Sequence, residues 1–225
     1  VYQLARTFFL SDSVRTLVSM DAARARKTTW RTPARDPETE RLLNWRLDPA
    51  VSTGLAGEWG SHQFDVFHWY TGRYPEAASG FGAVRIHEDG REVDDTVSCV
   101  LRFPGGAPLS WNGTLGNSYE GTHELLRGEN AAIKLAWTHG WMFKEADAPT
   151  QGWEVYANRQ QFHNDEGITL IAGATQLAEQ GKLEDGVGLP HTPLWYGVET
   201  FLRAVTEGVP VACTADEAAR STIVG

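Results

Sequence analysis

The sequence predicts an α+β fold, in which helices pack on one face of a large, open, mostly antiparallel sheet. Two observations carry this prediction. Between residues 77 and 157, short apolar alternations are separated by turn residues at roughly the spacing of consecutive antiparallel strands. Helical patterns stand on either side of that segment, one near residues 57–71 and others after residue 190. Strands and helices that occupy separate stretches of the chain are typical of α+β domains.

The first fifty residues contain the weakest signals of secondary structure. Apolar side chains alternate loosely over residues 1–10, and we expect a strand there. Residues 11–50 are rich in Arg, Thr and Pro, and they include the polar run TPARDPETER. Pro residues in such a run mark turns, so we expect a surface loop with one short helix.

A helix is expected over residues 57–71. Gly54 and Gly57 precede it, and Gly72 is placed to end it, since glycine adopts the left-handed conformation common just past a helix. One face of this helix carries the large apolar side chains of Phe64, Phe67 and Tyr70. That face is expected to pack against the sheet.

The strands expected between residues 77 and 157 include the segment GWEVYA at 152–157. Alternating apolar residues such as Val97, Cys99, Leu101 and Phe103 indicate that one face of the sheet is buried. The other face then needs a cover. Its apolar candidates are Trp111, Leu115, Trp137 and Phe143, and we expect homo-oligomerisation through it.

Helices are expected again toward the end of the chain. A helix is possible near residues 170–180. After residue 190 an amphipathic helix is clearly predicted, with a stripe formed by Leu194, Trp195, Val198, Phe201, Leu202 and Val205. The capping box Thr214-Ala215-Asp216-Glu217 opens the last helix.

Composition excludes several classes of protein. The 225 residues fit one domain, and the formal net charge of −9 argues against nucleic acid or an anionic membrane as partner. No apolar stretch is long enough to span a bilayer. Cys99 and Cys213 have neither a CxxC spacing nor a neighbouring His, so no metal or redox role is assigned to them. The composition fits a cytoplasmic protein, and it leaves export open.

The strongest functional signal is a polar stripe on the 57–71 helix. Glu58, His62 and Asp65 are separated by four and three positions, and such spacings bring side chains together on a helix. Two carboxylates beside an imidazole can move protons or bind a polar ligand. A structural role is also open, with His62 paired to a carboxylate and Glu58 complementing the helix dipole. His68 lies six positions after His62, so the two do not share a face, and no metal site is expected.

Around this stripe the sequence resembles the C-terminal domain of the glucose–fructose oxidoreductase/inositol dehydrogenase (Gfo/Idh/MocA) family. The pair Trp45-Arg46, the loop Ser52-Thr53-Gly54 and the segment Gly57-Glu58-Trp59-Gly60-Ser61-His62 carry the resemblance, with Asp65, Trp69 and Gly72 after them. Later landmarks are Asp94-Asp95-Thr96, Phe103-Pro104-Gly105-Gly106 and Leu126-Arg127-Gly128-Glu129-Asn130-Ala131. The resemblance implies a fold like the C-terminal domain of dihydrodipicolinate reductase.

The resemblance also implies a function. Family members look like two-domain enzymes that oxidise a sugar or polyol with NAD or NADP, which an N-terminal Rossmann domain binds. His62 is then the acid/base for the substrate hydroxyl. Glu58 stands where the family usually has Asp, and it is the second candidate catalytic residue, placed to orient the imidazole by an i,i+4 contact. The candidate substrate-binding residues are Arg46, Trp45, Asp65 and Trp59. Structural roles stay open for them: Arg46 could pair with a surface acid, Asp65 could hold a neighbouring loop, and the two tryptophans could form a sugar-stacking wall or pack in the core.

The cofactor-binding half is not found within these residues. No G-x-G-x-x-G motif opens a helix after a strand, and the family's Glu-Lys-Pro motif is absent. We therefore expect residues 1–225 to be one C-terminal substrate-binding and oligomerisation domain, shortened at both ends and inactive alone. Two alternatives remain open: a non-catalytic carbohydrate-binding or scaffold module on this fold, and a glycosidase of the same family that uses NAD without net redox change.

Overall fold

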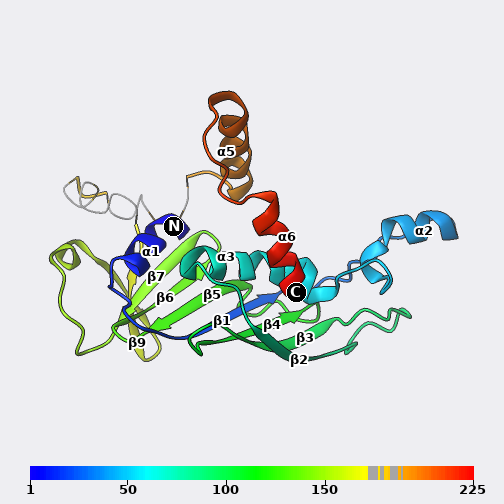
Figure 1. Cartoon of the computed structure of the whole chain (residues 1–225), viewed down its shortest axis with the longest axis horizontal. Helices are drawn as coiled ribbons and strands as arrows, with labels where there is room; N and C mark the ends of the chain where they lie inside the picture. Colours follow the sequence, from blue (N-terminus) through cyan, green and yellow to red (C-terminus); the bar gives the residue numbers. More distant parts are fainter. Residues whose placement is uncertain (172–176, 178–179, 183–186, 189) are drawn as a thin grey trace. The chain divides into compact units, whose positions relative to one another are not determined.

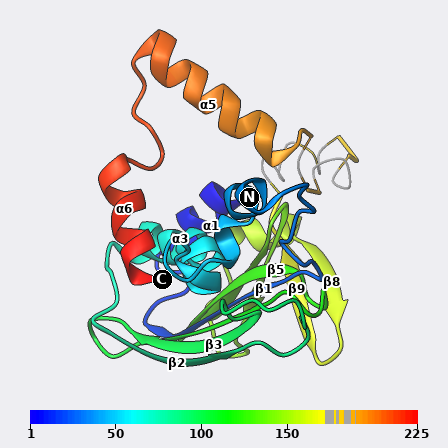
Figure 2. The same ribbon diagram turned by 90° about the vertical axis from the view of Figure 1, so that its right-hand side faces the viewer.

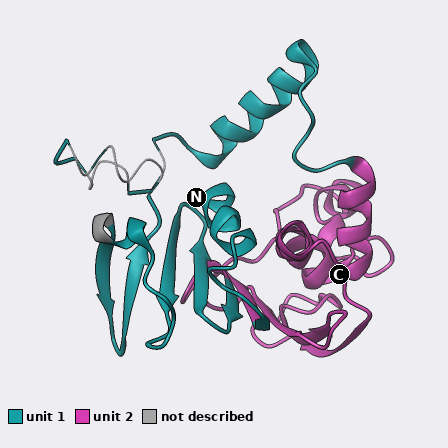
Figure 3. Cartoon of the chain, turned by 60° about the vertical axis from the view of Figure 1, so that its left-hand side comes forward, with its two compact units in different colours: residues 1–19, 125–214 teal, residues 20–124, 215–225 magenta. Residues whose placement is uncertain are grey.

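The structure is a computed structural model of the whole chain. It describes all residues except 172–176, 178–179, 183–186 and 189. The chain divides into two compact units (Figure 3). Unit 1 comprises residues 1–19 and 125–214, and unit 2 comprises residues 20–124 and 215–225.

The α+β class predicted from the sequence is confirmed. The helices are α1 (Tyr2–Leu10), α2 (Pro37–Leu43), η1 (Trp45–Leu47), η2 (Ala56–Gly60), α3 (Ser61–Thr71), η3 (Gly152–Tyr156), α5 (Pro193–Glu207) and α6 (Ala215–Val224). The strands are β1 (Leu17–Ala25), β2 (Ala77–Ala83), β3 (Thr96–Arg102), β4 (Pro108–Thr114), β5 (Thr122–Gly128), β6 (Ala131–Ala136), β7 (His139–Lys144), β8 (Asn158–Phe162) and β9 (Asp165–Thr169).

The nine strands form one sheet in the order β2-β3-β4-β1-β5-β6-β7-β9-β8. Strand β1 pairs with β4 in parallel, with Ala22 opposite Trp111. The pairs β2–β3, β3–β4, β6–β7, β7–β9 and β8–β9 are antiparallel. The sheet is therefore mostly antiparallel.

In unit 2, α3 and α6 lie on one face of the strands (Figures 1 and 2). Phe64, Phe67 and Tyr70 of α3 are each at most 2% exposed, so the predicted packing face is confirmed. The buried amide of Gln63 joins the helix to the strands beneath it. Its Nε2 donates to the Glu124 carboxylate at 2.8 Å, and its Oε1 accepts from the Trp111 indole at 2.8 Å.

Two predictions for the first fifty residues were wrong. Residues 1–10 contain the helix α1, which packs against β6 within unit 1. Apolar residues at positions 1, 4, 5, 8 and 9 follow the helical period, which explains the outcome. The expected loop also contains β1, where only Met20 and Ala22 are buried. The predicted short helix exists as α2, which Asp36 caps by accepting from the backbone amides of Glu38 and Thr39.

Two further corrections concern the second half of the chain. Residues 152–156 form the 3-10 helix η3, and Glu154 closes its capping box with Gln151. The polar segment after it contains β8 and β9, a hairpin that the sequence analysis did not predict. The helix considered near residues 170–180 falls mostly outside the described residues.

The prediction that Trp111 and Leu115 lie on the face of the sheet that the helices leave uncovered was also wrong. Both side chains are fully buried, and Trp111 lies on the helix-covered face, where its ring meets Phe64 at 5.9 Å. In unit 2 the opposite face carries Phe81 and Val100, which are 87% and 50% exposed. In unit 1, Phe143 packs on Phe162 at 5.2 Å, whereas Trp137 is exposed in the turn between β6 and β7.

The predicted amphipathic helix after residue 190 is confirmed as α5. Thr192 caps its start by accepting from the Trp195 amide, and Gly208 ends it with φ 69°. No residue of α5 is buried, and Phe201 is 63% exposed. The apolar stripe of α5 is thus uncovered in the described part of the chain. None of the helices in that part has the length and apolar character that a membrane crossing needs.

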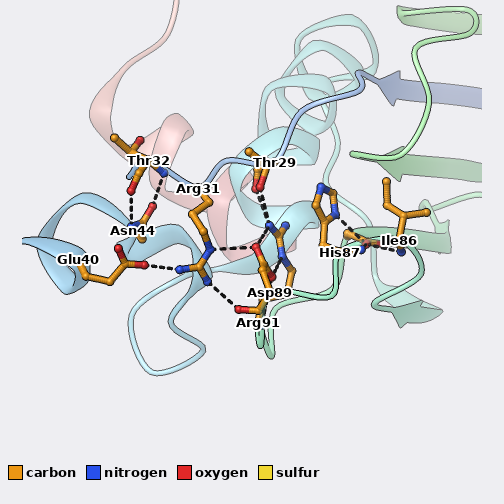
Figure 4. Close-up of polar contacts among 10 residues, drawn as sticks. Thr29, Arg31, Thr32, Glu40, Asn44, Ile86, His87, Asp89 and Arg91 are labelled. Atoms are coloured by element: carbon orange, nitrogen blue, oxygen red, sulfur yellow. Dashed lines mark hydrogen bonds and ion pairs between the residues drawn. The ribbon is translucent and has the colours of Figure 1, made fainter. Parts of the chain in front are cut away.

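A polar network joins two loops of unit 2 to the helix α2 (Figure 4). Asp89 accepts hydrogen bonds from Arg31 and Arg91, while Arg31 also pairs with Glu40 of α2. The Arg91 side chain is fully buried, and its Nη2 donates to Asp89 and to the carbonyl of Thr29. Hydrogen bonds from Arg91, and then from Arg31, hold the pKa of Asp89 far below its ordinary range, although burial opposes the shift.

Asp95 organises the start of the β2–β3 connection. Its buried carboxylate accepts hydrogen bonds from the backbone amides of Arg85, Ile86 and His87, and from the His87 ring at 2.9 Å. Burial alone raises the pKa of this carboxyl, but the backbone hydrogen bonds outweigh it and hold the pKa far below 3.8. The ionised form is therefore the one that the fold stabilises.

Replacing Asp95 by asparagine is expected to lower the free energy of unfolding at neutral pH by on the order of 2 kcal/mol. A folded-state pKa below the unfolded value stabilises the fold above that value, and this contribution is lost as the pH falls. Urea titrations between pH 7 and pH 3 should therefore show a steeper loss of stability in the wild type than in Asp95→Asn. The exposed neighbour Glu92, changed to Gln, is the control. Parallel wild-type and Asp95→Asn curves would contradict the assignment.

Candidate active site

The site begins in a distorted turn ahead of α3. Residues Ala56–Gly60 form the π-helical turn η2, which is wider than an α-helical turn and is frequent at functional sites. A Cβ on Gly57 would lie 2.3 Å from Thr53 Oγ1, so only glycine allows the loop to pass this close. The helix then ends at Gly72 with φ 68°, as predicted.

Glu58 is held by the segment before the helix. Its Oε2 accepts from Arg46 Nε at 3.0 Å, and Thr53 Oγ1 lies 3.4 Å from its Oε1. The Glu58 side chain is 15% exposed and that of Arg46 is 47% exposed. The guanidinium of Arg46 also lies over the Trp45 ring, 4.5 Å from its centroid. The structure therefore brings together three residues that the sequence analysis had chosen separately.

Asp65 points toward α6. Its Oδ1 accepts from Ser221 Oγ at 3.0 Å, and Ser221 is 2% exposed. This bond ties α3 to α6 within unit 2. A substrate-binding role for Asp65 stays a prediction.

His62 is exposed at the surface of unit 2, and its imidazole makes no hydrogen bond within the described part of the chain. Neighbouring protein atoms lower the pKa of the imidazole by desolvation, and the positive charge of Arg24 lowers it further. Asp65 and Glu58 oppose this effect less strongly. His62 is thus favoured as a neutral base, and neither carboxylate orients it by a direct bond within the described residues.

The two tryptophans of the predicted site differ in exposure. Trp59 is 7% exposed, with Trp30 against it edge-on at 5.4 Å and the Arg24 guanidinium 4.8 Å from its ring centroid. Trp45 is 36% exposed, so part of it remains accessible. A stacking wall for a ligand is therefore better supplied by Trp45 than by Trp59.

The other histidines considered from the sequence lie in different surroundings. The His68 ring stacks on Tyr74 at 3.8 Å, and His191 stacks on Trp195 at 4.3 Å in unit 1. Within the described ranges, no three His, Cys, Asp or Glu side chains are grouped closely enough to hold a metal ion. Cys99 is half-buried, and burial raises the pKa of its thiol to about 11.

Arg24 is the neighbour of His62 that the sequence analysis missed. It lies in β1, within a stretch that was expected to be a loop. The signal that could have found it is the alternation of Ala and Arg in the segment DAARAR, residues 21–26. Residues at every second position of a strand share a face, so this alternation is typical of a strand.

A family model described as the GFO/IDH/MocA C-terminal domain matches residues 21–134, just over half of the 225 residues. No curated protein matches the chain.

Several solved structures share the fold. A levoglucosan dehydrogenase in complex with NADH and levoglucosan is 16% identical, with a TM-score of 0.66 over 98% of this chain and 58% of that one. An oxidoreductase domain protein from Kribbella flavida is 16% identical, with a TM-score of 0.65 over 99% and 58%. An aldose-aldose oxidoreductase from Caulobacter crescentus, complexed with glycerol, is 13% identical, with a TM-score of 0.65 over 99% and 55%. The chain therefore spans less than two thirds of the length of these oxidoreductases.

Proposed function

Because the chain belongs to the Gfo/Idh/MocA family through its C-terminal domain, we propose that it is the substrate domain of an NAD(P)-dependent oxidoreductase acting on a sugar or polyol. The observation that carries the proposal is the exposed side chain of His62, whose imidazole has a lowered pKa and makes no hydrogen bond within the described residues. A neutral imidazole can accept the proton of a hydroxyl group as that carbon is oxidised.

Glu58 and Arg46 are proposed to help bind the substrate beside His62. Since the Glu58 carboxylate is bonded to Arg46 and not to the imidazole, it acts on His62 through its charge alone, and more weakly than Arg24 does. Arg46 keeps donors beyond the Nε that it spends on Glu58, and about half of its side chain is exposed. We propose that Arg46 and the exposed part of Trp45 contact substrate hydroxyl groups and ring carbons, while Glu58 positions Arg46.

The cofactor in this proposal is NAD or NADP, whose nicotinamide accepts the hydride. Dinucleotide phosphates are normally bound by a glycine-rich turn between a strand and a helix. The described residues contain no such turn: η2, the glycine-rich segment nearest the site, lies against Thr53 and Phe64. We therefore propose that a Rossmann domain encoded before these residues binds most of the cofactor, leaving His62 to face the reacting carbon.

The matching structures support the type of chemistry. Two of them were solved with a sugar or polyol, levoglucosan in one case and glycerol in the other, and the first also with NADH. At 16% and 13% identity, the ligands of these structures do not identify the substrate of this chain. A redox-neutral glycosidase of the same family stays as the second candidate, because transient oxidation would use the same base.

Homo-oligomerisation belongs to the same proposal. The exposed apolar side chains of Phe81 and Val100 in unit 2 are the surface that we propose for contact between copies, in place of Trp111 and Leu115. We also propose a cytoplasmic location, which suits the supply of nicotinamide cofactors.

The protein expressed from its whole gene is expected to reduce NAD or NADP when given its substrate, with one reduced nicotinamide formed for each hydroxyl oxidised. Incubation with a panel of sugars and polyols, followed by absorbance, measures this directly. Substrate consumption without net reduction would favour the glycosidase. Binding of sugars without turnover, together with a gene that encodes no Rossmann domain, would favour the non-catalytic module and refute the proposal.

A further inference from the structure

Two arginines lie on the same side of β1 near its end. Arg24 is the penultimate residue of the strand, and Arg26 follows it by two positions. The backbone amide of Arg26 still donates to Thr114 of β4, so the extended pairing continues past Ala25. Residues two apart in extended chain point to the same side. The two guanidinium groups are therefore neighbours.

Neither guanidinium is neutralised by a close carboxylate. Among the described residues, no Asp or Glu oxygen lies within 4.0 Å of Arg24 or Arg26, although the chain has 29 acidic residues for 20 basic ones. Desolvation lowers the pKa of Arg24, and the charge of Arg26 lowers it further. Repulsion between two adjacent cations is unfavourable unless an anion relieves it.

Arg24 is held by an aromatic ring, and its guanidinium donates no hydrogen bond within the part of the chain that the structure describes. Its guanidinium lies over the Trp59 ring at 4.8 Å, and Trp30 packs against that ring. Stacking on an aromatic face fixes the plane of a guanidinium and leaves its N–H groups free to bind in the plane. Glu124 attracts Arg24 from nearby. However, its carboxylate is 2% exposed and accepts a hydrogen bond from Gln63.

The position of this arginine matters because it is close to His62. Its charge acts on the His62 imidazole more strongly than either Asp65 or Glu58 does. Because Arg24 is near enough to act on the imidazole, an anion that it binds can belong to the same ligand as the proposed reacting hydroxyl.

We propose that Arg24, seated on Trp59 and reinforced by Arg26, binds an anionic group of the substrate. The substrate would then be a sugar acid or a sugar phosphate rather than a neutral sugar or polyol. Both groups present planar or near-planar pairs of oxygens that a guanidinium binds with two parallel hydrogen bonds. This inference rests on the proposed oxidoreductase function, since it assigns the substrate class of the same site.

A different role for Arg24 is to balance the buried charge of Glu124. Loss of Arg24 would then destabilise the fold and affect all substrates alike. The inference instead requires an effect confined to anionic ligands. A KM that changes for one ligand class, with an unchanged kcat, separates the two roles.

The test uses the protein expressed from its whole gene, with gluconate, glucose 6-phosphate and glucose as probes. Arg24→Gln is compared with Arg24→Lys and with Arg102→Gln, which removes an exposed arginine of β3 in the same unit. Turnover is measured with NAD and with NADP, and binding of each probe is measured separately by calorimetry. We expect an anionic probe to be preferred over glucose, and Arg24→Gln to raise its KM on the order of tenfold or more. Arg24→Lys should recover part of the loss, and Arg102→Gln should change nothing.

Several results would overturn the inference. These are a preference for glucose, an equal effect of Arg24→Gln on charged and neutral probes, and a loss confined to the affinity for NADP. The last would assign Arg24 to a cofactor phosphate. Calorimetric binding of an anionic probe that depends on Arg24, without turnover of any probe, would keep the anion site and refute the oxidoreductase. Turnover of neutral sugars that depends on His62, without turnover of the anionic probes, would keep the oxidoreductase and refute the anion site.

Discussion

Replacing Asp89 by alanine should lower the free energy of unfolding by about 3–5 kcal/mol, because it leaves the buried Arg91 charge without its carboxylate. The Arg91 side chain is 0% exposed, and its Nη1 already lacks a hydrogen-bond partner among the described residues. Once Asp89 is removed, only Thr29 still accepts from its guanidinium. Equilibrium unfolding in urea measures the loss.

Two variants make this prediction specific. Glu88→Ala removes an exposed carboxylate one position earlier, and it should change the stability by less than about 0.5 kcal/mol. The double variant Asp89→Ala/Arg91→Met removes both charges and should be more stable than Asp89→Ala alone, since replacing a buried ion pair by apolar groups is often tolerated. If Asp89→Ala and Glu88→Ala were equally stable, the network in Figure 4 would have no energetic role.

Replacing His62 by glutamine should reduce kcat for hydroxyl oxidation by about 10²- to 10⁴-fold, the usual contribution of a general acid/base. The side chain is exposed and makes no hydrogen bond within the described residues, so the fold should be unaffected. Stopped-flow measurement of hydride transfer isolates the step. His163→Gln, which changes an exposed histidine of unit 1, is the matched control. Full turnover by His62→Gln would assign the proton to another group.

Local signals in the sequence predicted the elements that depend on local physics. The 57–71 helix was predicted from its apolar face and from Gly72, and both features concern residues within a few positions of each other. The amphipathic pattern that predicted α5 belongs to the same class, and so does the sequence Thr214-Ala215-Asp216-Glu217 that predicted a helix where α6 lies. By contrast, β1 is a strand because it pairs with β4, which follows it by some ninety positions, and no local pattern records that pairing.

In the candidate site, too, some features could be predicted from the local sequence, and others depend on contacts between distant segments. His62, Glu58 and Arg46 were found from sequence, but the bond between Arg46 and Glu58 depends on how the π-helical turn η2 presents the carboxylate. Arg24 was missed because it lies in the strand β1, far in sequence from the helix α3 that carries His62. The burial of Trp111 was misassigned because the direction of a strand side chain is set by register, and a shift of one residue reverses it.

The pH dependence of kcat/KM tests the central claim that His62 is the proton acceptor. The pKa of its imidazole lies below the ordinary value of 6.5, because desolvation and Arg24 both disfavour the charged form. The account therefore predicts an activity that falls on acidification with a midpoint below pH 6.5. That limb should disappear in the residual activity of His62→Gln. A limb that persists unchanged in the variant would contradict the account.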